Sequence, residues 1–97
     1  MIEIKTPEEI KIMQEGGVIL RRIAQTVADQ AKKGVSLKSL DELARKEMLE
    51  AGGKPAFLNY RPAGASKPYP ASICASVNEV IVHGLPSDYL LKNGDLL

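Results

Sequence analysis

The segment YPASICASVNEVIVHGLP, residues 69–86, decides the fold predicted for this chain. From its third residue onward, apolar and small polar residues alternate with a period of two, which is typical of a strand with one buried face. Asn78-Glu79 predicts a turn, and a second apolar run at residues 80–83 ends at Gly84. The segment therefore predicts a β-hairpin.

A third strand is predicted to begin at residues 95–97, after the turn pair Asn93-Gly94. We expect the domain to continue past Leu97, because a strand of this length leaves an unpaired sheet edge. The 97-residue chain is therefore expected to be less stable than a complete domain and to associate through that edge.

Two amphipathic helices are predicted upstream of these strands, at residues 7–33 and 37–52. Thr6 and Glu9 form a capping box for the first helix, and Ser36 is a plausible cap for the second. The link between the helices is short, which favours an antiparallel pair.

The glycine pair Gly16-Gly17 lies inside the first helix, where each glycine costs up to ~1 kcal/mol relative to alanine. A hinge and the close approach of another element are the two interpretations. We favour close approach, because no other helix-breaking residue surrounds the pair.

Residues 55–70 are rich in proline and predict a loop. The loop holds three of the chain's four aromatic residues, namely Phe57, Tyr60 and Tyr69. Such a cluster forms either a small satellite core or the wall of a pocket, and composition alone does not decide between them.

Composition excludes several classes of protein. The net charge of +1 argues against a strongly basic nucleic-acid binder, and no apolar run reaches the ~20 residues that span a bilayer. Cys74 is the only cysteine, so no internal disulfide forms, and the start of the chain lacks the pattern of a signal peptide. We expect a cytoplasmic protein.

Taken alone, the chemically active residues are few. His83 is the only histidine, and a single histidine at a strand end is more often structural than catalytic. A lone cysteine on a strand, such as Cys74, is more often a small buried apolar residue than a nucleophile. Because a zinc site needs about three or four ligands, the chain is not expected to bind a divalent metal tightly.

In combination, these residues resemble the bacterial type I methionine aminopeptidases. The resemblance rests on the Ser-Ile-Cys, Ser-Val-Asn-Glu and Val-His-Gly elements within residues 69–86. Residues 4–13, 54–57 and 93–96 also resemble the family, so essentially the whole chain is covered. The resemblance implies an α/β (α+β) fold, the amino-terminal half of the pita-bread aminopeptidase architecture.

The resemblance also implies roles for particular residues. His83 matches the family histidine that contacts the substrate near the scissile amide, and it is the expected catalytic residue. The expected wall of the pocket for the methionine side chain comprises Cys74, Tyr69, Tyr60 and Phe57. Residues 61–68 form a longer connection than in many relatives and are expected to reshape the pocket rim.

The activity implied is removal of the initiator methionine from nascent proteins when the next residue is small. In the family, two divalent metal ions (cobalt, manganese, iron or zinc) activate the attacking water. Their ligands lie beyond Leu97, so no metal ligand is assigned and the chain alone is expected to be inactive. Nascent polypeptides are the expected partner and the ribosome a further candidate, without nucleic acid or membrane binding, and the full-length protein is expected to be a monomer.

Two other functions remain open. One is a non-catalytic binding protein with the pita-bread fold, which an Ile-Asp-x-Gly-type strand after Leu97 would disfavour. The other is a different aminopeptidase of this fold, such as an Xaa-Pro aminopeptidase. Those enzymes commonly carry a large preceding domain, whereas the first helix here begins next to Thr6.

Overall fold

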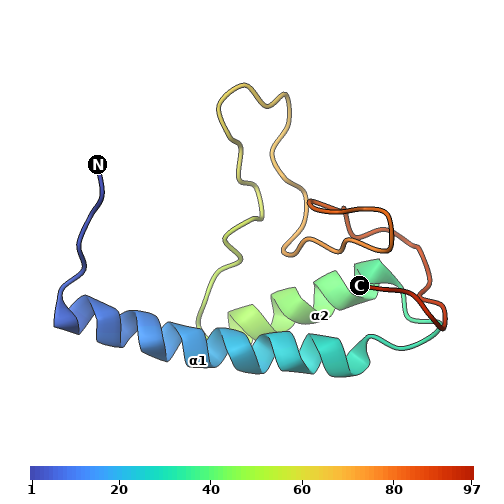
Figure 1. Ribbon diagram of the computed structural model, residues 1–97, viewed down its shortest axis with the longest axis horizontal. Helices are drawn as coiled ribbons and strands as arrows, with labels where there is room; N and C mark the ends of the chain where they lie inside the picture. Colours follow the sequence, from blue (N-terminus) through green and yellow to red (C-terminus); the bar gives the residue numbers. More distant parts are fainter.

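The computed structural model describes residues 1–97 and contains two helices and almost no strand (Figure 1). Helix α1 spans Pro7–Gln30 and helix α2 spans Leu37–Glu50. The rest of the chain is irregular, with one isolated antiparallel bridge between Ser36 and Leu90. Neither helix has an apolar stretch long enough to cross a membrane.

The predicted amino-terminal caps of both helices are confirmed. The Glu9 N–H donates to Thr6 Oγ1 at 3.2 Å, and the Thr6 N–H donates to the Glu9 carboxylate at 2.8 Å. At the start of α2, Ser36 Oγ accepts from the Ser39 N–H at 3.0 Å. These bonds satisfy backbone donors that have no partner within a first helical turn.

Both helices end earlier than predicted. Helix α1 ends at Gln30 instead of residue 33, because the link to α2 turns to meet the carboxy-terminal part of the chain. There the Gly34 N–H donates to Leu91 O at 2.8 Å, and the Leu91 N–H donates to Val35 O at 2.9 Å. Helix α2 ends at Glu50 instead of residue 52.

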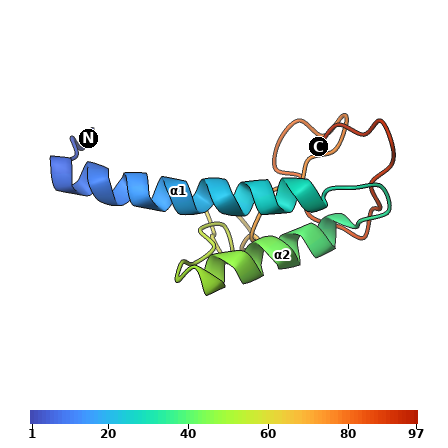
Figure 2. The same ribbon diagram turned by 90° about the horizontal axis from the view of Figure 1, so that it is seen from below.

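The two helices pack side by side only along the carboxy-terminal half of α1, and the amino-terminal half projects beyond α2 (Figure 2). Four buried residues form the core cluster: Leu37, Leu40, Ala75 and Leu91. The core therefore joins α2 to two segments of irregular chain, and the pocket described below is built on these segments.

The interpretation of Gly16-Gly17 as a close-packing site is wrong for this structure. A methyl group placed on either glycine meets no atom within 4 Å outside the helix. Large apolar side chains near the pair, including Val18 and Leu20, are also exposed. This part of α1 is an uncovered apolar surface.

The predicted hairpin is not supported, because residues 71–83 form no strand. The predicted turn at Asn78-Glu79 is present, with Asn78 at a φ of 55° and the Val80 N–H donating to Val77 O at 3.1 Å. His83, at a φ of 57°, interrupts the extended backbone that the second strand requires. Only one backbone bond, from the Ala75 N–H to Gly84 O at 2.8 Å, joins the two arms of the predicted hairpin beyond its turn. The Gly84 N–H is taken by Ser76 Oγ at 3.0 Å, so no ladder forms.

The predicted third strand is also absent at residues 95–97. The Asn78 N–H donates to Leu96 O at 2.9 Å, but the Leu96 N–H donates to the Asn78 side-chain oxygen at 3.0 Å. A side chain thus replaces the backbone acceptor that would continue a ladder.

The Asp41 carboxylate connects α2 to the start of residues 71–86. One of its oxygens accepts from the Ser72 N–H at 2.7 Å and from the Ile73 N–H at 2.9 Å. Hydrogen bonds to an ionised acceptor are stronger than neutral ones. This carboxylate therefore supplies the acceptor that a neighbouring strand would otherwise provide.

We expect Asp41→Ala to lower the free energy of unfolding of the chain by about 1.5–3 kcal/mol, because it leaves the buried Ser72 amide without an acceptor. Glu42→Ala, on the exposed neighbour, is the matched control and should cost about 0.5 kcal/mol or less. Urea unfolding followed by circular dichroism measures both. Equal losses in the two variants would show that the Asp41 contacts do not stabilise the fold.

The Asp95 carboxylate forms a second network. It accepts from the Asn78 side-chain amide at 3.0 Å, from the Lys92 N–H at 2.8 Å and from the Tyr89 hydroxyl at 2.9 Å. The bond from Asn78, followed by that from Lys92, lowers the pKa of Asp95 below its ordinary value of 3.8.

A lowered pKa in the folded state gives stability that is present above pH 3.8 and lost as the pH falls through the folded value. Below pH 3.8 the urea midpoint of the unaltered chain should therefore fall more steeply than that of Asp95→Asn. Asp88→Asn is the matched control and should follow the unaltered chain. Parallel curves for all three proteins between pH 6 and pH 2.5 would contradict the assignment.

Candidate functional site

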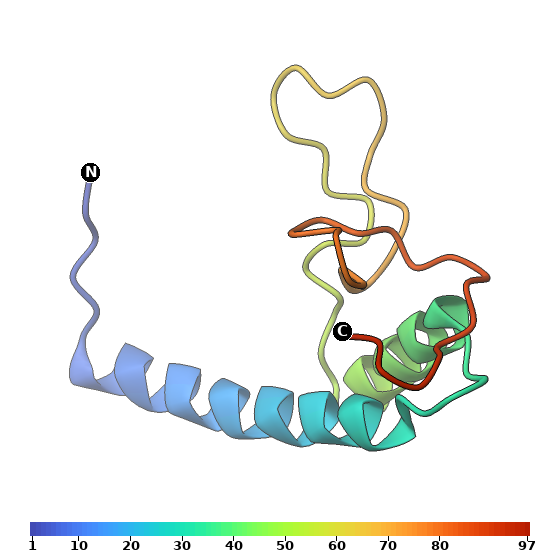
Figure 3. The ribbon, with the colours of Figure 1, turned by 45° about the vertical axis from the view of Figure 1, so that its right-hand side comes forward.

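One pocket of about 520 Å³ brings together all five side chains predicted for the site. It is lined by Phe57, Tyr60, Pro62, Tyr69, Cys74, His83 and Leu85. These residues come from two pieces of chain. They are the projecting loop, residues 55–70, and the segment beneath it, residues 71–86, which lie next to each other in Figure 3. The roles assigned to the five residues stay predictions, although their proximity is now observed.

Two backbone hydrogen bonds hold the base of the projecting loop. The Asn59 N–H donates to Tyr69 O, and the Tyr69 N–H donates to Tyr60 O, both at 2.8 Å. The pairing places both tyrosines at the pocket although eight residues separate them in the sequence. The Phe57 ring meets the Tyr69 ring edge-to-face, with 6.3 Å between centroids and an interplanar angle of 84°. Such edge-to-face pairs are favourable beyond the area that they bury.

The Tyr69 hydroxyl forms a hydrogen bond within the protein. Its closest acceptor is Ile73 O at 2.9 Å, and it also lies 3.4 Å from Gly84 O and 3.5 Å from the Cys74 sulfur. Burial first, and then the hydrogen bond and charge of Cys74, strongly raise the pKa of Tyr69. The phenol therefore stays protonated at neutral pH, so Tyr69 serves as a wall and a hydrogen-bond donor, and not as a base.

The Cys74 thiol is exposed, so the expectation that it is a buried apolar residue is wrong. The alternation predicted for this segment places Cys74 on the face opposite Ile73, Ala75 and Val77, and these three residues pack in or against the core cluster while Cys74 is exposed. Instead the sulfur lines the pocket beside Tyr69. A polarizable sulfur bordered by aromatic rings is well suited to contact a thioether or another apolar side chain.

His83 is exposed at the edge of the same pocket. Its φ of 57° falls in the left-handed region, which turns the chain directly before Gly84. The imidazole is not buried, which disfavours the interpretation of His83 as a structural histidine of the core. From this position it is available to donate a hydrogen bond to a ligand in the pocket.

Gly84 is required by a close backbone approach. A methyl group placed on it would overlap Ala75 O and lie 2.8 Å from Ser76 Cα. The contact brings the His83 end of the loop against the segment that carries Cys74. Only glycine allows this approach without displacing backbone atoms.

Sequence reasoning missed two lining residues, Pro62 and Leu85. Each lies two residues from a predicted site residue, Tyr60 and His83 respectively, and that spacing was the only available signal. It also missed a neighbouring apolar hollow of about 440 Å³ between α1 and the end of α2, which shares Phe57 with the pocket. The buried Ser72 hydroxyl lines that hollow and has no hydrogen-bond partner.

No three side chains of the acid, histidine or cysteine types gather at any point of residues 1–97. Cys74 and His83 line the pocket without a neighbouring carboxylate in its wall. These residues do not fit a centre of two divalent metal ions, which needs several carboxylate or imidazole ligands.

The chain matches the model of metallopeptidase family M24 over residues 11–97 and belongs to that family. Among curated proteins it is 39% identical to the methionine aminopeptidase of Aquifex aeolicus, over 99% of this chain and 38% of that protein. It is 38% identical to methionine aminopeptidase 1 of Bacillus subtilis, over 100% of this chain and 37% of that protein.

Solved structures give the same result. The methionine aminopeptidase of Rickettsia prowazekii superposes with a TM-score of 0.89 at 35% identity, covering 98% of this chain and 36% of that chain. The enzyme of Thermotoga maritima has a TM-score of 0.86 at 34% identity, with the same coverage. The chain thus has part of the pita-bread fold and spans 38% or less of these four relatives.

We expect Gly84→Ala to lower the free energy of unfolding by about 1–3 kcal/mol, because the added methyl group overlaps the Ala75 backbone. Gly16→Ala is the matched glycine substitution in an open helical position, and it should stabilise by about 0.5–1 kcal/mol. Thermal and urea melts of the two variants give opposite signs if the backbone contact is real. A neutral Gly84→Ala would disprove it.

Proposed function

We propose that residues 1–97 form the methionine-binding side of a methionine aminopeptidase, the front part of one pita-bread catalytic domain. The observation that supports this proposal most directly is that the five side chains expected from the resemblance line a single pocket. The names of the relatives at 38–39% identity support the same activity. The reaction is removal of the initiator methionine from polypeptides whose second residue is small.

The pocket wall suits a methionine side chain. Phe57, Tyr69 and Cys74 present aromatic edges and a sulfur atom to an unbranched thioether, and Tyr60 adds a further ring. The hydroxyl of Tyr69 is bound to Ile73 O, so its ring faces the ligand without an uncompensated donor. The site therefore selects the first side chain mainly by apolar contact.

His83 is proposed to act on the peptide bond that is cleaved. From the edge of the pocket, its imidazole N–H donates to the scissile amide and stabilises the charge that develops there. One such donor typically contributes ~10²–10³-fold to turnover. His83 is proposed neither as a metal ligand nor as part of the core.

The metal centre of the proposed enzyme would lie outside residues 1–97. In methionine aminopeptidases, as the resemblance implies, two divalent ions activate water and are held by two aspartates, a histidine and two glutamates. The proposed setting is the cytoplasm, where nascent polypeptides supply the substrate and the ribosome is a further partner. The proposed complete enzyme is a monomer.

A chimaeric enzyme tests the proposal. Residues 1–97 replace the matching segment of the Aquifex aeolicus methionine aminopeptidase, and release of methionine from a Met-Ala-Ser peptide is measured with cobalt or manganese. We expect hydrolysis, and a fall of ~10²–10³-fold in turnover on His83→Ala with little change in metal content or melting temperature. A folded, metal-loaded chimaera without activity would overturn the proposal.

His83→Gly is the second variant, because the left-handed backbone at this position favours glycine over alanine. It removes the imidazole without strain and should lose as much turnover as His83→Ala. If both variants are destabilised but fully active per folded molecule, His83 is structural and its catalytic assignment is wrong.

A further inference from the structure

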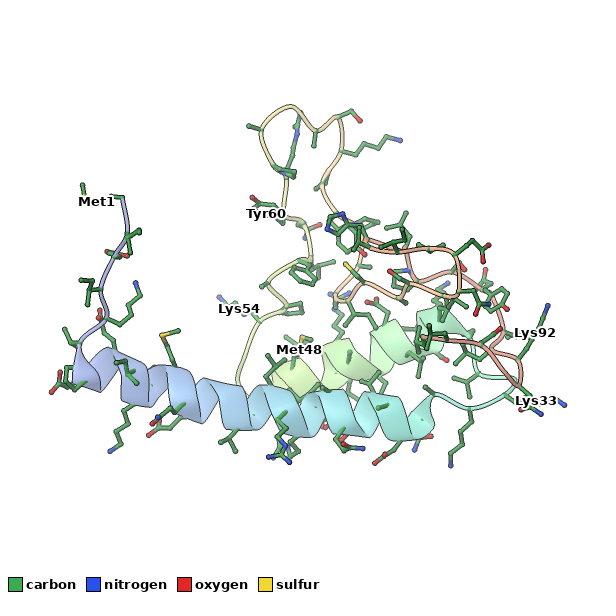
Figure 4. The ribbon with its side chains drawn as sticks, in the orientation of Figure 1. Met1, Lys33, Met48, Lys54, Tyr60 and Lys92 are labelled. Atoms are coloured by element: carbon green, nitrogen blue, oxygen red, sulfur yellow. The ribbon has the colours of Figure 1, made fainter.

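The charged side chains of the projecting loop are all positive. Residues 51–78 contain no aspartate or glutamate, but they contain three cations, Lys54, Arg61 and Lys67. Two of these cations, Arg61 and Lys67, lie on either side of residues 62–66 in the sequence. The loop that contains them stands away from the helices (Figure 4). The net charge of the whole chain is only +1, so the loop is a local concentration of positive charge.

The loop is ordered by its own bonds. The Ala65 N–H donates to Pro62 O at 3.1 Å, with Gly64 at a φ of 83°, as a tight turn requires. Arg61 Nε donates to Ala65 O at 3.0 Å across this turn. The base is closed by the paired backbone bonds of Tyr60 and Tyr69. The Arg61 side chain is therefore fastened to the backbone of its own turn.

Neither loop cation has an acidic partner. The ion pairs of the chain are Lys5 with Glu3 and Lys46 with Glu50, and both lie on other elements. The Asp41 carboxylate, which anchors the segment beneath the pocket, already accepts from two backbone amides. The positive charge of the loop is thus available to a ligand.

The loop is continuous with the pocket wall, since Tyr60, Pro62 and Tyr69 all line it. Acidic side chains of a bound polypeptide that pass within about one Debye length of the loop cations, ~10 Å at 0.1 M salt, would be attracted to them.

We infer that the loop at residues 61–68 is a specificity element that favours polypeptides with aspartate or glutamate shortly after the small second residue. This inference rests on the proposed function. Two exposed charge pairs of ordinary strength would give about a threefold to tenfold preference for acidic over basic sequences. Nucleic acid is a poorer fit, because two cations neutralise too few phosphates for useful affinity.

The test uses the chimaera of residues 1–97 with the Aquifex aeolicus enzyme, prepared without metal so that the peptides are not cleaved, isotopically labelled and observed by nuclear magnetic resonance. It is titrated with Met-Ala-Ser-Asp-Asp and Met-Ala-Ser-Lys-Lys peptide amides, and the amide shifts of Tyr60, Tyr69 and His83 report on the pocket. We expect the acidic peptide to bind about threefold to tenfold more tightly at about 0.1 M salt. The preference should fall below about twofold at about 1 M salt, where the Debye length is ~3 Å.

Matched variants assign the effect to the loop. The double variant Arg61→Gln with Lys67→Gln should abolish the preference. The variant Lys32→Gln with Lys38→Gln removes the same charge from exposed positions away from the pocket and should keep it. Arg61→Lys retains the charge and should also keep it.

The outcomes separate the inference from the proposed function. Equal binding of both peptides at the pocket overturns the inference and leaves the methionine site standing. Absence of binding by either peptide overturns the methionine site and the inference with it. Loop shifts with a uridine homopolymer but not with the acidic peptide would identify a nucleic-acid surface and overturn the inference.

Discussion

The rest of the structure depends on the two hydrogen bonds that the Asp41 carboxylate accepts from the backbone of Ser72 and Ile73. These amides open the segment that carries Cys74 and then Ala75, a member of the core cluster. The segment has no partner strand, and a buried amide without an acceptor costs about 1–3 kcal/mol. One carboxylate on α2 thus performs the function of a neighbouring strand and sets the position of the pocket relative to the helices.

With this anchor in place, the pocket is shaped by individual contacts and not by a sheet. The backbone contact of Gly84 with Ala75 brings His83 towards Cys74, and the Tyr69 hydroxyl ties the projecting loop to Ile73. Each of these contacts is a single hydrogen bond or a single close approach, whereas the strands of a sheet are held in register by many hydrogen bonds. The wall of the pocket is consequently sensitive to single substitutions at a few positions, most of them outside the lining itself.

The sequence predicted the local features well. Helix caps depend on residues three positions apart, and those at Thr6 and Ser36 were found correctly. The turn at Asn78-Glu79 was predicted correctly, but the two strands of the hairpin are absent, because the apolar pattern says nothing about the positive φ at His83 or about the hydrogen bond from the Gly84 N–H to Ser76 Oγ. Asp41 was missed because its partners lie 31 and 32 residues away, and no pattern marks a carboxylate that accepts from backbone amides. The five pocket residues came from resemblance to a family, since composition left open whether the aromatic loop was a core or a wall.

The distribution of apolar surface explains how a chain with only 8 of 97 residues buried still presents an organised pocket. The buried residues cluster where α2 meets the segments beneath the pocket, while the amino-terminal half of α1 and residues 80–82 expose large apolar side chains. Contiguous exposed apolar surface marks places that other protein surfaces cover. The pocket side chains depend instead on bonds made within residues 57–84, as for Tyr69 with Ile73 and Gly84 with Ala75. The shape of the pocket is therefore set by contacts within this segment, and its position relative to the helices is set by Asp41.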